Sequence, residues 1–263
     1  MIYPSQQKAI EYIAQKFLAD PQIDALLVTG SIAHGFNEEF SDVDIAIVIS
    51  EELYQQKKAN EILTYWESAE NFYHGGYFDG KFISLENLAL IAERANEPTK
   101  FAFQDAIIAF DKTNHIGKIL KIIGNYPLEL YSKNVLRFLA QIEGWKWYCK
   151  EAINKNNKYL LDISVTKFIL FVGRLILLDN KMFFPYHKWF LRVLETVPNK
   201  PQNLIMYINE LLNEKTMKNI NNLYELIIKY KNWTNGLEYS WTSYFVNDIE
   251  LNWMNGNEFV ENI

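Results

Sequence analysis

Two aspartates at the start of an apolar stretch have the types and spacing of a metal-binding pair. Asp42 and Asp44 lead directly into residues 45–49, which are all apolar. Side chains alternate between the two faces of a strand, so both carboxylates point the same way, about 7 Å apart. Two like charges at this spacing are costly unless a cation lies between them. The pair therefore predicts a divalent-metal site at the end of a buried strand.

A glycine-serine turn, Gly30 and Ser31, follows another apolar stretch at residues 23–29. Glycine lets the backbone approach a phosphate closely, and the serine hydroxyl and the amides that follow are hydrogen-bond donors. A phosphate cradle beside a divalent metal is the arrangement that nucleotidyl transfer requires. We therefore expect Mg²⁺ as cofactor and a nucleoside triphosphate as substrate. Asp42 and Asp44 are the predicted catalytic and metal-binding residues, and Gly30 and Ser31 are predicted to bind the nucleotide.

The complete stretch of residues 26–49, LLVTGSIAHGFNEEFSDVDIAIVI, carries a family resemblance. It resembles the signature of the nucleotidyltransferase superfamily related to DNA polymerase β: an apolar strand, Gly-Ser, a spacer of about a dozen residues, and Asp-hydrophobic-Asp-hydrophobic. The resemblance implies an α+β fold, in which a small mixed β-sheet has helices on one side and carboxylates on adjacent strands. It also implies a third carboxylate, as metal ligand or general base.

Asp79 is the predicted third catalytic and metal-binding carboxylate, because residues 76–83 could form a strand next to the aspartate pair. The alternative is a hairpin turn, since Asp-Gly between short apolar runs is typical of one. Asp105 and Asp111, which flank the apolar residues 106–110, are the other candidates for the third carboxylate. His34, in the spacer, could reach a phosphate or a base, or could have no role in the site.

Apolar periodicity divides the chain into a nucleotidyltransferase domain at residues 1–113 and an all-helical domain at residues 114–263. In the first, we expect helices at residues 5–20, 51–68 and 84–95, strands at 23–29, 43–49 and 106–110, and two short strands within 72–84. In the second, we expect helices at residues 128–154, 158–178, 187–196, 202–213, 217–230 and 240–254. Pro127, Pro185 and Gly236 are among the residues that separate them.

Two basic residues of the helical part are predicted to contact the triphosphate. Arg174 lies in the otherwise apolar stretch TKFILFVGRLILL, where a charge needs a partner, and it is seven residues from Lys167 and so on the same helix face. Lys188 follows in the segment PYHKW. In antibiotic nucleotidyltransferases, which the chain resembles in its overall plan, a lysine of the helical domain contacts the nucleotide phosphates. The alternative for Arg174 and Lys188 is an internal ion pair, for example with Asp179 or Asp162.

Composition limits the partners and the compartment. The net charge is −6, with 8 Lys and Arg against 18 Asp and Glu in residues 1–113, and 18 against 14 in residues 114–263. This acidity, without a basic stripe, argues against a long nucleic acid. No apolar run reaches the length of a membrane span, the first residues lack a signal-peptide pattern, and Cys149 is the only cysteine. We expect a cytoplasmic protein that does not bind membranes, and the sequence does not indicate its oligomeric state.

The nature of the acceptor follows from resemblance alone. The order of a nucleotidyltransferase head and a helical body resembles aminoglycoside and lincosamide adenylyltransferases, which implies transfer of AMP from ATP to a small hydroxylated acceptor. An acidic cleft would also attract a polycationic aminoglycoside. Two alternatives remain: modification of a protein hydroxyl, and a non-catalytic nucleotide-binding or antitoxin-type module.

Overall fold

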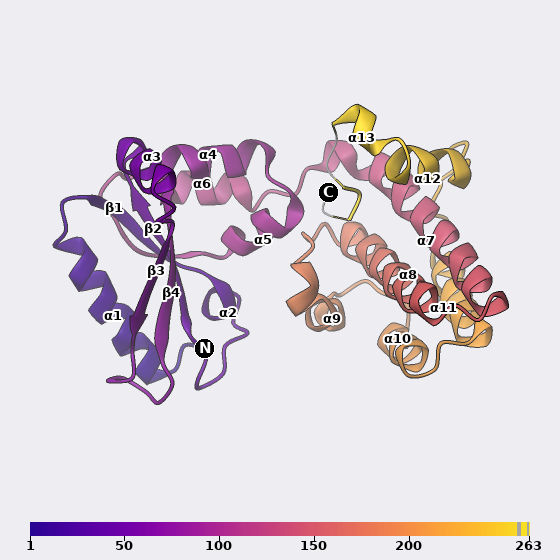
Figure 1. Ribbon diagram of the computed structural model, residues 1–263, viewed down its shortest axis with the longest axis horizontal. Helices are drawn as coiled ribbons and strands as arrows, with labels where there is room; N and C mark the ends of the chain where they lie inside the picture. Colours follow the sequence, from indigo (N-terminus) through magenta and orange to yellow (C-terminus); the bar gives the residue numbers. More distant parts are fainter. Residues whose placement is uncertain (257–258, 262) are drawn as a thin grey trace. The chain divides into compact units, whose positions relative to one another are not determined.

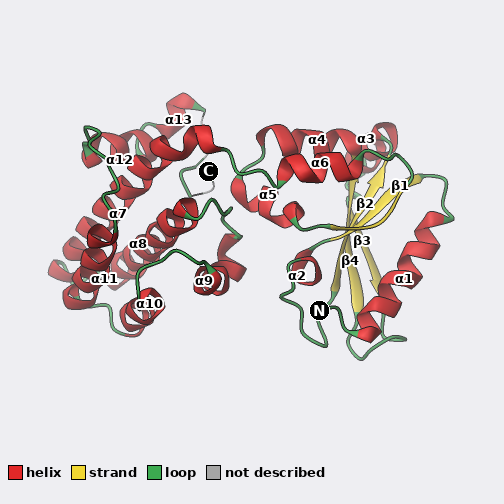
Figure 2. Cartoon of the chain, turned by 180° about the vertical axis from the view of Figure 1, so that it is seen from behind, coloured by secondary structure: helices red, strands yellow, loops and turns green. Residues whose placement is uncertain are grey.

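The computed structural model describes residues 1–256, 259–261 and 263 of the 263-residue chain. The chain divides into two compact units, Met1–Asn125 and Tyr126–Ile263, called the sheet unit and the helical unit below. Figure 2 shows that the strands of the described residues all lie in the sheet unit. A mixed sheet with helices, followed by a helical part, confirms the predicted α+β class.

The sheet has five strands in the order β3-β4-β2-β1-β5. Their bounds are β1 Ile23–Val28, β2 Val43–Ile49, β3 Thr64–Ser68, β4 Tyr77–Ser84 and β5 Ile107–Asp111. β2 and β4 are parallel, whereas the other neighbouring pairs are antiparallel. β1 and β2 are buried along almost their whole length, as expected of apolar strands at the centre of a sheet that is covered on both faces.

Helices pack on both faces of the sheet, so the expectation of helices on one side only is wrong. α1 (Pro4–Leu18) forms a buried cluster with residues of β1 and β2 on one face. Residues of α4 (Leu85–Arg94), α5 (Glu97–Gln104) and α6 (Ile116–Ile123) pack against the alternate residues of the same strands on the other face. Figure 1 shows α1 apart from α4 and α6 across the strands. Apart from Asp24 and Asp44, β1 and β2 are apolar on both faces, and this requires the double cover.

The expected helix at residues 51–68 is in fact a shorter helix followed by an edge strand. α3 (Glu51–Ala59) begins at Ser50, whose hydroxyl accepts a hydrogen bond from the Leu53 amide, and it ends at Asn60. Glu61 then has a positive φ of 59°, which a helix does not accommodate. In β3, exposed and half-buried residues alternate, which is the pattern of a strand with one face open.

The two short strands expected within residues 72–84 are one strand, β4. Asp79 and Gly80 lie in its middle and pair with β2 on one side and β3 on the other. The hairpin-turn interpretation is therefore wrong. A Cβ atom at Gly80 would lie 2.9 Å from the Tyr65 Cβ, so this glycine permits close approach of β3 instead of a turn.

Two helices of the sheet unit, α5 and α6, had no counterpart in the predicted elements. Pro98 stands in the first turn of α5, and the Asn96 side chain caps that helix by accepting from the Thr99 amide. α6 places Ile116, Leu120 and Ile123 in the cluster under the sheet. Because α6 packs there, the sheet unit extends to Asn125 and not to residue 113.

The helical unit is built around two long helices, which carry most of its buried side chains. Its elements are η1 Leu128–Leu130, α7 Tyr131–Asn154, α8 Lys158–Asp179, α9 Tyr186–Thr196, α10 Leu204–Asn213, α11 Met217–Tyr230, α12 Trp241–Ile249 and α13 Asn252–Asn255. The single helix expected at residues 240–254 is divided into α12 and α13. Among the described residues, no helix is both long enough and apolar enough to cross a membrane.

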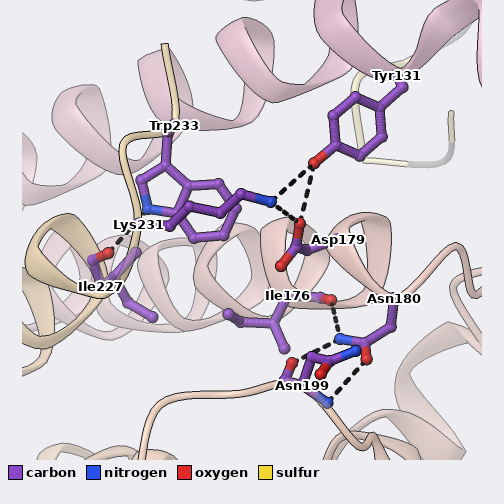
Figure 3. A network of polar contacts seen from close by, with 8 residues as sticks. All are labelled: Tyr131, Ile176, Asp179, Asn180, Asn199, Ile227, Lys231 and Trp233. Atoms are coloured by element: carbon purple, nitrogen blue, oxygen red, sulfur yellow. Dashed lines mark hydrogen bonds and ion pairs between the residues drawn. The ribbon is translucent and has the colours of Figure 1, made fainter. Parts of the chain in front are cut away.

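A polar network joins the end of α8 to α7 and to the segment after α11 (Figure 3). Lys231 forms an ion pair with Asp179, which also accepts a hydrogen bond from the Tyr131 hydroxyl at 2.9 Å. Asn180 donates to the carbonyl of Asn199 and accepts from its amide. These contacts hold the end of α8 against α7 and against the segments that contain Lys231 and Asn199.

The only cysteine provides a test of this packing. Burial raises the pKa of the Cys149 thiol from 9.0 to about 12. We expect the native protein at pH 8 to react with a disulfide reagent such as Ellman's reagent far more slowly than the protein unfolded in guanidinium, which should release one equivalent. Above pH 9.0 the thiol loses its proton in the unfolded state but keeps it in the folded state. The free energy of unfolding therefore decreases as the pH rises beyond that value. Fast labelling of the native protein would contradict the packing of α7.

Candidate active site

Three carboxylates meet at one end of β2 and β4. Asp42 precedes β2, Asp44 lies in it, and Asp79 lies in β4; an oxygen atom of each is within 4.8 Å of one of the others. Asp44 and Asp79 are direct partners in the parallel ladder. Asp42 and Asp44 are half-buried, whereas Asp79 is exposed. The pairing of the two strands, rather than the sequence spacing, brings the third acid to the first two.

The residue types of this acidic cluster suit a hard divalent cation. Mg²⁺ prefers carboxylate oxygens, keeps several waters, and is held by a few acids together with substrate phosphates. Asp42, Asp44 and Asp79 offer carboxylate oxygens only, on a side of the sheet that remains open to solvent at Asp79. These three residues would hold one or two such ions.

Gly30 is required by the cluster itself. Its φ is 62°, in the left-handed region that favours glycine, and a Cβ atom built on it would overlap the Oδ2 atom of Asp44. The adjacent Thr29 amide donates to the Asp44 carbonyl at 2.9 Å. The turn after β1 therefore lies directly against the second aspartate, as the phosphate-cradle interpretation of Gly-Ser requires.

Ser31 supplies a hydroxyl that the protein leaves unsatisfied. Gly30 and Ser31 are the first two residues of the short helix α2 (Gly30–Ala33). The Ser31 side chain is buried, yet its Oγ atom has no hydrogen-bond partner among the described residues. A buried hydroxyl without a partner costs free energy, about 1–3 kcal/mol in proteins. A ligand oxygen would satisfy it, so the atom fits a phosphate held next to Asp44.

The loop between the turn and the aspartates is fixed by residues that sequence reasoning missed. The buried Gln6 amide of α1 donates to the carbonyls of Glu38 at 2.8 Å and Ser41 at 3.3 Å. The Tyr73 hydroxyl donates to the same Ser41 carbonyl at 2.9 Å. A long-range contact to a carbonyl depends on backbone position, so no pattern in the sequence could have indicated these anchors.

Tyr77, at the start of β4, was also missed. A hydrogen bond to the Asp42 carboxylate, strengthened by the negative charges of Asp42, Asp79 and Asp44, raises the pKa of the Tyr77 hydroxyl. Burial and the charge of Asp42 raise the pKa of Tyr73 to about 12. Both phenols therefore stay protonated at neutral pH, and the Tyr77 hydroxyl lies within the influence of the acids of the cluster.

Asp105 and His34 pair with each other, away from the cluster. The Nδ1 atom of His34 lies 2.9 Å from the Oδ2 atom of Asp105, and the imidazole stacks on Phe101 with ring centroids 4.3 Å apart. The His34 side chain is only 3% exposed. His34 thus ties α2 to the end of α5, and neither residue belongs to the group of three acids.

Asp111, the other alternative for the third carboxylate, shapes the start of α6. Its carboxylate accepts hydrogen bonds from the amides of Thr113, Asn114 and Ile116. Partial burial alone would raise the pKa of the Asp111 carboxyl, but these bonds together lower it. The Thr113 hydroxyl also donates to this carboxylate at 2.7 Å, so all the donors belong to the turn after β5, which is a structural role.

Arg174 lies inside the helical unit and is only 1% exposed. Its guanidinium donates to the carbonyls of Glu261 and Ile263 and lies 4.8 Å and 4.6 Å from the ring centroids of Phe138 and Phe184. The predicted shared face with Lys167 is present, because Lys167 forms an ion pair with the Glu261 carboxylate. Arg174 therefore has partners, as expected of a charge in an apolar helix, and these are the carbonyls of Glu261 and Ile263 in the same unit.

Lys188 is exposed in the first turn of α9, with its Nζ atom 5.0 Å from the Trp189 ring centroid. The acids suggested as internal partners of Arg174 and Lys188 bind other lysines: Asp179 pairs with Lys231, and Asp162 pairs with Lys215 at 2.7 Å. The structure therefore brings Gly30, Ser31, Asp42, Asp44 and Asp79 together. A nucleotide contact of Lys188 stays a prediction.

Cavities of the helical unit do not contain this chemistry. A hollow of about 440 Å³ is lined by residues of α10 and α11. Another, of about 450 Å³, is lined by residues of α7, of α11 and of the segment that follows α11. Their linings include no residue of the acidic cluster. A site for a metal and phosphates is polar and open, so cavity size is a poor guide to it.

Comparisons with known proteins agree with the sheet unit's chemistry. Residues 8–97, which contain all five residues brought together, match the family model described as polymerase beta, nucleotidyltransferase. Residues 95–190 match a domain of unknown function, DUF4037. A nucleotidyltransferase-like protein from Exiguobacterium sibiricum is similar in structure, with 13% identity and a TM-score of 0.45 over 96% of this chain and 80% of that one. No curated protein sequence matches the chain.

Gly30 and Gly35 form a matched pair of variants. Both have a positive φ, of 62° and 68°, but a Cβ atom at Gly35 meets nothing within 4 Å. Each change to alanine should cost about 1–2 kcal/mol of stability through backbone strain. Only Gly30→Ala should also displace the Asp44 carboxylate and weaken Mn²⁺ binding, by about tenfold or more. Calorimetric titration with Mn²⁺ and thermal unfolding of both variants check this; equal Mn²⁺ affinities would refute the contact.

Proposed function

We propose that this chain, whose residues 8–97 form a nucleotidyltransferase domain of the polymerase beta family, transfers a nucleoside monophosphate from a nucleoside triphosphate to a hydroxyl of a small molecule. The observation that carries the proposal is the meeting of Asp42, Asp44 and Asp79 within 4.8 Å, next to Gly30 and the unsatisfied Ser31 hydroxyl. Three carboxylates this close repel one another, and a bound cation would offset that repulsion.

In the proposed reaction, the acceptor oxygen attacks the α-phosphorus. The new bond joins that oxygen to the phosphorus, the bond to the oxygen that bridges the α- and β-phosphates breaks, and pyrophosphate leaves with the bonding electrons. Mg²⁺, when bound, lowers the pKa of the attacking hydroxyl and neutralises the triphosphate. Asp42 and Asp44, with Asp79 beside them, would hold the cation, and Ser31 would donate to a phosphate oxygen. Asp79, the exposed member, accepts the proton of the acceptor hydroxyl at its carboxylate.

The proposed acceptors include cationic hydroxylated compounds such as aminoglycosides. Residues 1–113 carry 8 Lys and Arg against 18 Asp and Glu, so the field around this part of the chain attracts cations. A triphosphate bound with one Mg²⁺ is itself a net anion, so its binding leaves this field negative. ATP is the proposed donor and the first one to test.

Transfer is tested by incubating the protein with Mg²⁺, α-labelled ATP or another triphosphate, and a panel of aminoglycosides, lincosamides and simple polyols. We expect acceptor-dependent release of pyrophosphate and a labelled product. Asp42→Asn, Asp44→Asn and Asp79→Asn should each lower turnover by about 10²-fold or more, because each removes a charge at the reacting centre. Circular dichroism of each variant verifies that it is folded.

Asp105→Asn is the matched control, since it removes an acid of the same unit that pairs with His34 outside the cluster. Its turnover should equal that of the unmodified protein. Near-normal turnover of Asp79→Asn would contradict its assignment as the third carboxylate. Magnesium-dependent binding of triphosphate without transfer to any compound or protein would instead identify a non-catalytic nucleotide-binding module.

A further inference from the structure

An exposed tryptophan lies in line with the acids of the cluster. Trp66, in the edge strand β3, is 69% exposed and is the direct partner of Asp79 in the antiparallel ladder. On its other side, Asp79 is the partner of Asp44. Side chains of directly paired residues point to the same face of a sheet. Asp44, Asp79 and Trp66 therefore form one row across three strands, on one face.

A second aromatic ring supports the tryptophan. Tyr77 is two residues before Asp79 in β4, so it shares the same face, and its ring stacks against Trp66 with centroids 6.4 Å apart and planes 27° apart. The Asp42 carboxylate has the largest effect on the pKa of the Tyr77 hydroxyl, so this hydroxyl lies on the side of the acidic cluster. One ring thus connects the acidic cluster to the exposed indole and limits the orientations that the indole can adopt.

Strand order places the two rings opposite the phosphate cradle. Gly30 and Ser31 follow β1, which neighbours β2 on the side away from β4. Trp66 lies beyond β4, at the other flank of the acids. In an in-line displacement, the attacking and leaving oxygens lie on opposite sides of the phosphorus. Pyrophosphate that leaves toward Ser31 requires an acceptor that enters from the side of Trp66.

We infer that Trp66 and Tyr77 form the acceptor subsite, and that the acceptor carries its reacting hydroxyl on or beside a ring whose flat face lies on the Trp66 indole. This inference rests on the proposed function, because it takes the direction of transfer from it. Glycosides and nucleosides both have such a ring. Stacking on an aromatic side chain changes affinity by about tenfold or more per ring, and an open-chain polyol gains none of it.

The test separates nucleotide binding from acceptor binding. The protein is saturated with Mg²⁺ and the non-hydrolysable analogue α,β-methylene-ATP, and is then titrated calorimetrically with phenyl β-D-glucoside, uridine or sorbitol. We expect at least one ring compound to bind and sorbitol not to bind. Trp66→Ala should weaken the ring compound by about tenfold or more, and Trp66→Phe, which keeps a flat ring, by much less. Whichever of the glucoside and the nucleoside binds more tightly identifies the class of ring.

Two controls assign each possible failure. Trp147→Ala removes an exposed indole of the helical unit and should leave both binding events unchanged. Asp44→Asn should abolish magnesium-dependent binding of the analogue. If the analogue does not bind with Mg²⁺, the proposed function fails, and the acceptor role of Trp66 fails with it. If the analogue binds but no ring compound does, or Trp66→Ala binds ring compounds as the unmodified protein does, only the acceptor subsite is overturned.

Discussion

The parallel pairing of β2 with β4 is the constraint on which the chemistry of the sheet unit depends. It places Asp79 opposite Asp44 and thereby concentrates three negative charges at one end of the sheet. A shift of this register by one residue would turn the side chain of Asp79 to the other face and move the apolar residues of β4 out of the core. The alternation of buried and exposed residues along β4 fixes the register, so the core holds the acids together in spite of their repulsion.

One face of the sheet serves two purposes along its length. Ala46 and Val48 continue the alternation that begins with Asp42 and Asp44, and they pack in the cluster with α4, α5 and α6. The acids lie on the same side of β2 but before that cluster, where Asp79 remains exposed. A strand that is apolar under the helices and acidic beyond them carries its ligand groups on a rigid support. Such a support keeps ligand positions well defined.

The helical unit shows how a buried charge is satisfied within a fold. Arg174 lies between two phenyl rings and donates to the carbonyls of Glu261 and Ile263, so it fixes the C-terminal segment against α8. A buried cation without partners would be strongly destabilising. The apolar sequence around Arg174 was enough to predict that a partner exists. Whether that partner is a phosphate or a carbonyl of the same chain depends on which segments return to the helix, and local sequence does not contain this information.

Elements with a strong local signal were predicted well. The buried strands β1 and β2, the helix α4 and the long helices α7 and α8 follow from apolar periodicity. The errors lie where tertiary contacts override local preference. Residues 64–68 form a strand because β4 provides a neighbour to pair with, and Asp79-Gly80 continues through a strand for the same reason. The helices α5 and α6 are short, and their apolar side chains are buried only because the sheet packs against them.

The sequence by itself predicted the reaction chemistry: Gly30, Ser31, Asp42 and Asp44 are close along the chain, so spacing and residue type were sufficient to predict a phosphate cradle beside a metal-binding pair. Only the tertiary structure decided which candidate acid joins the pair: the sequence favoured Asp79 over Asp105 and Asp111, and strand pairing brings Asp79 to the other two acids. The same holds for Trp66, Tyr77 and Gln6. Their places at the site follow from contacts between segments distant in sequence, and such contacts exist only after the chain has folded.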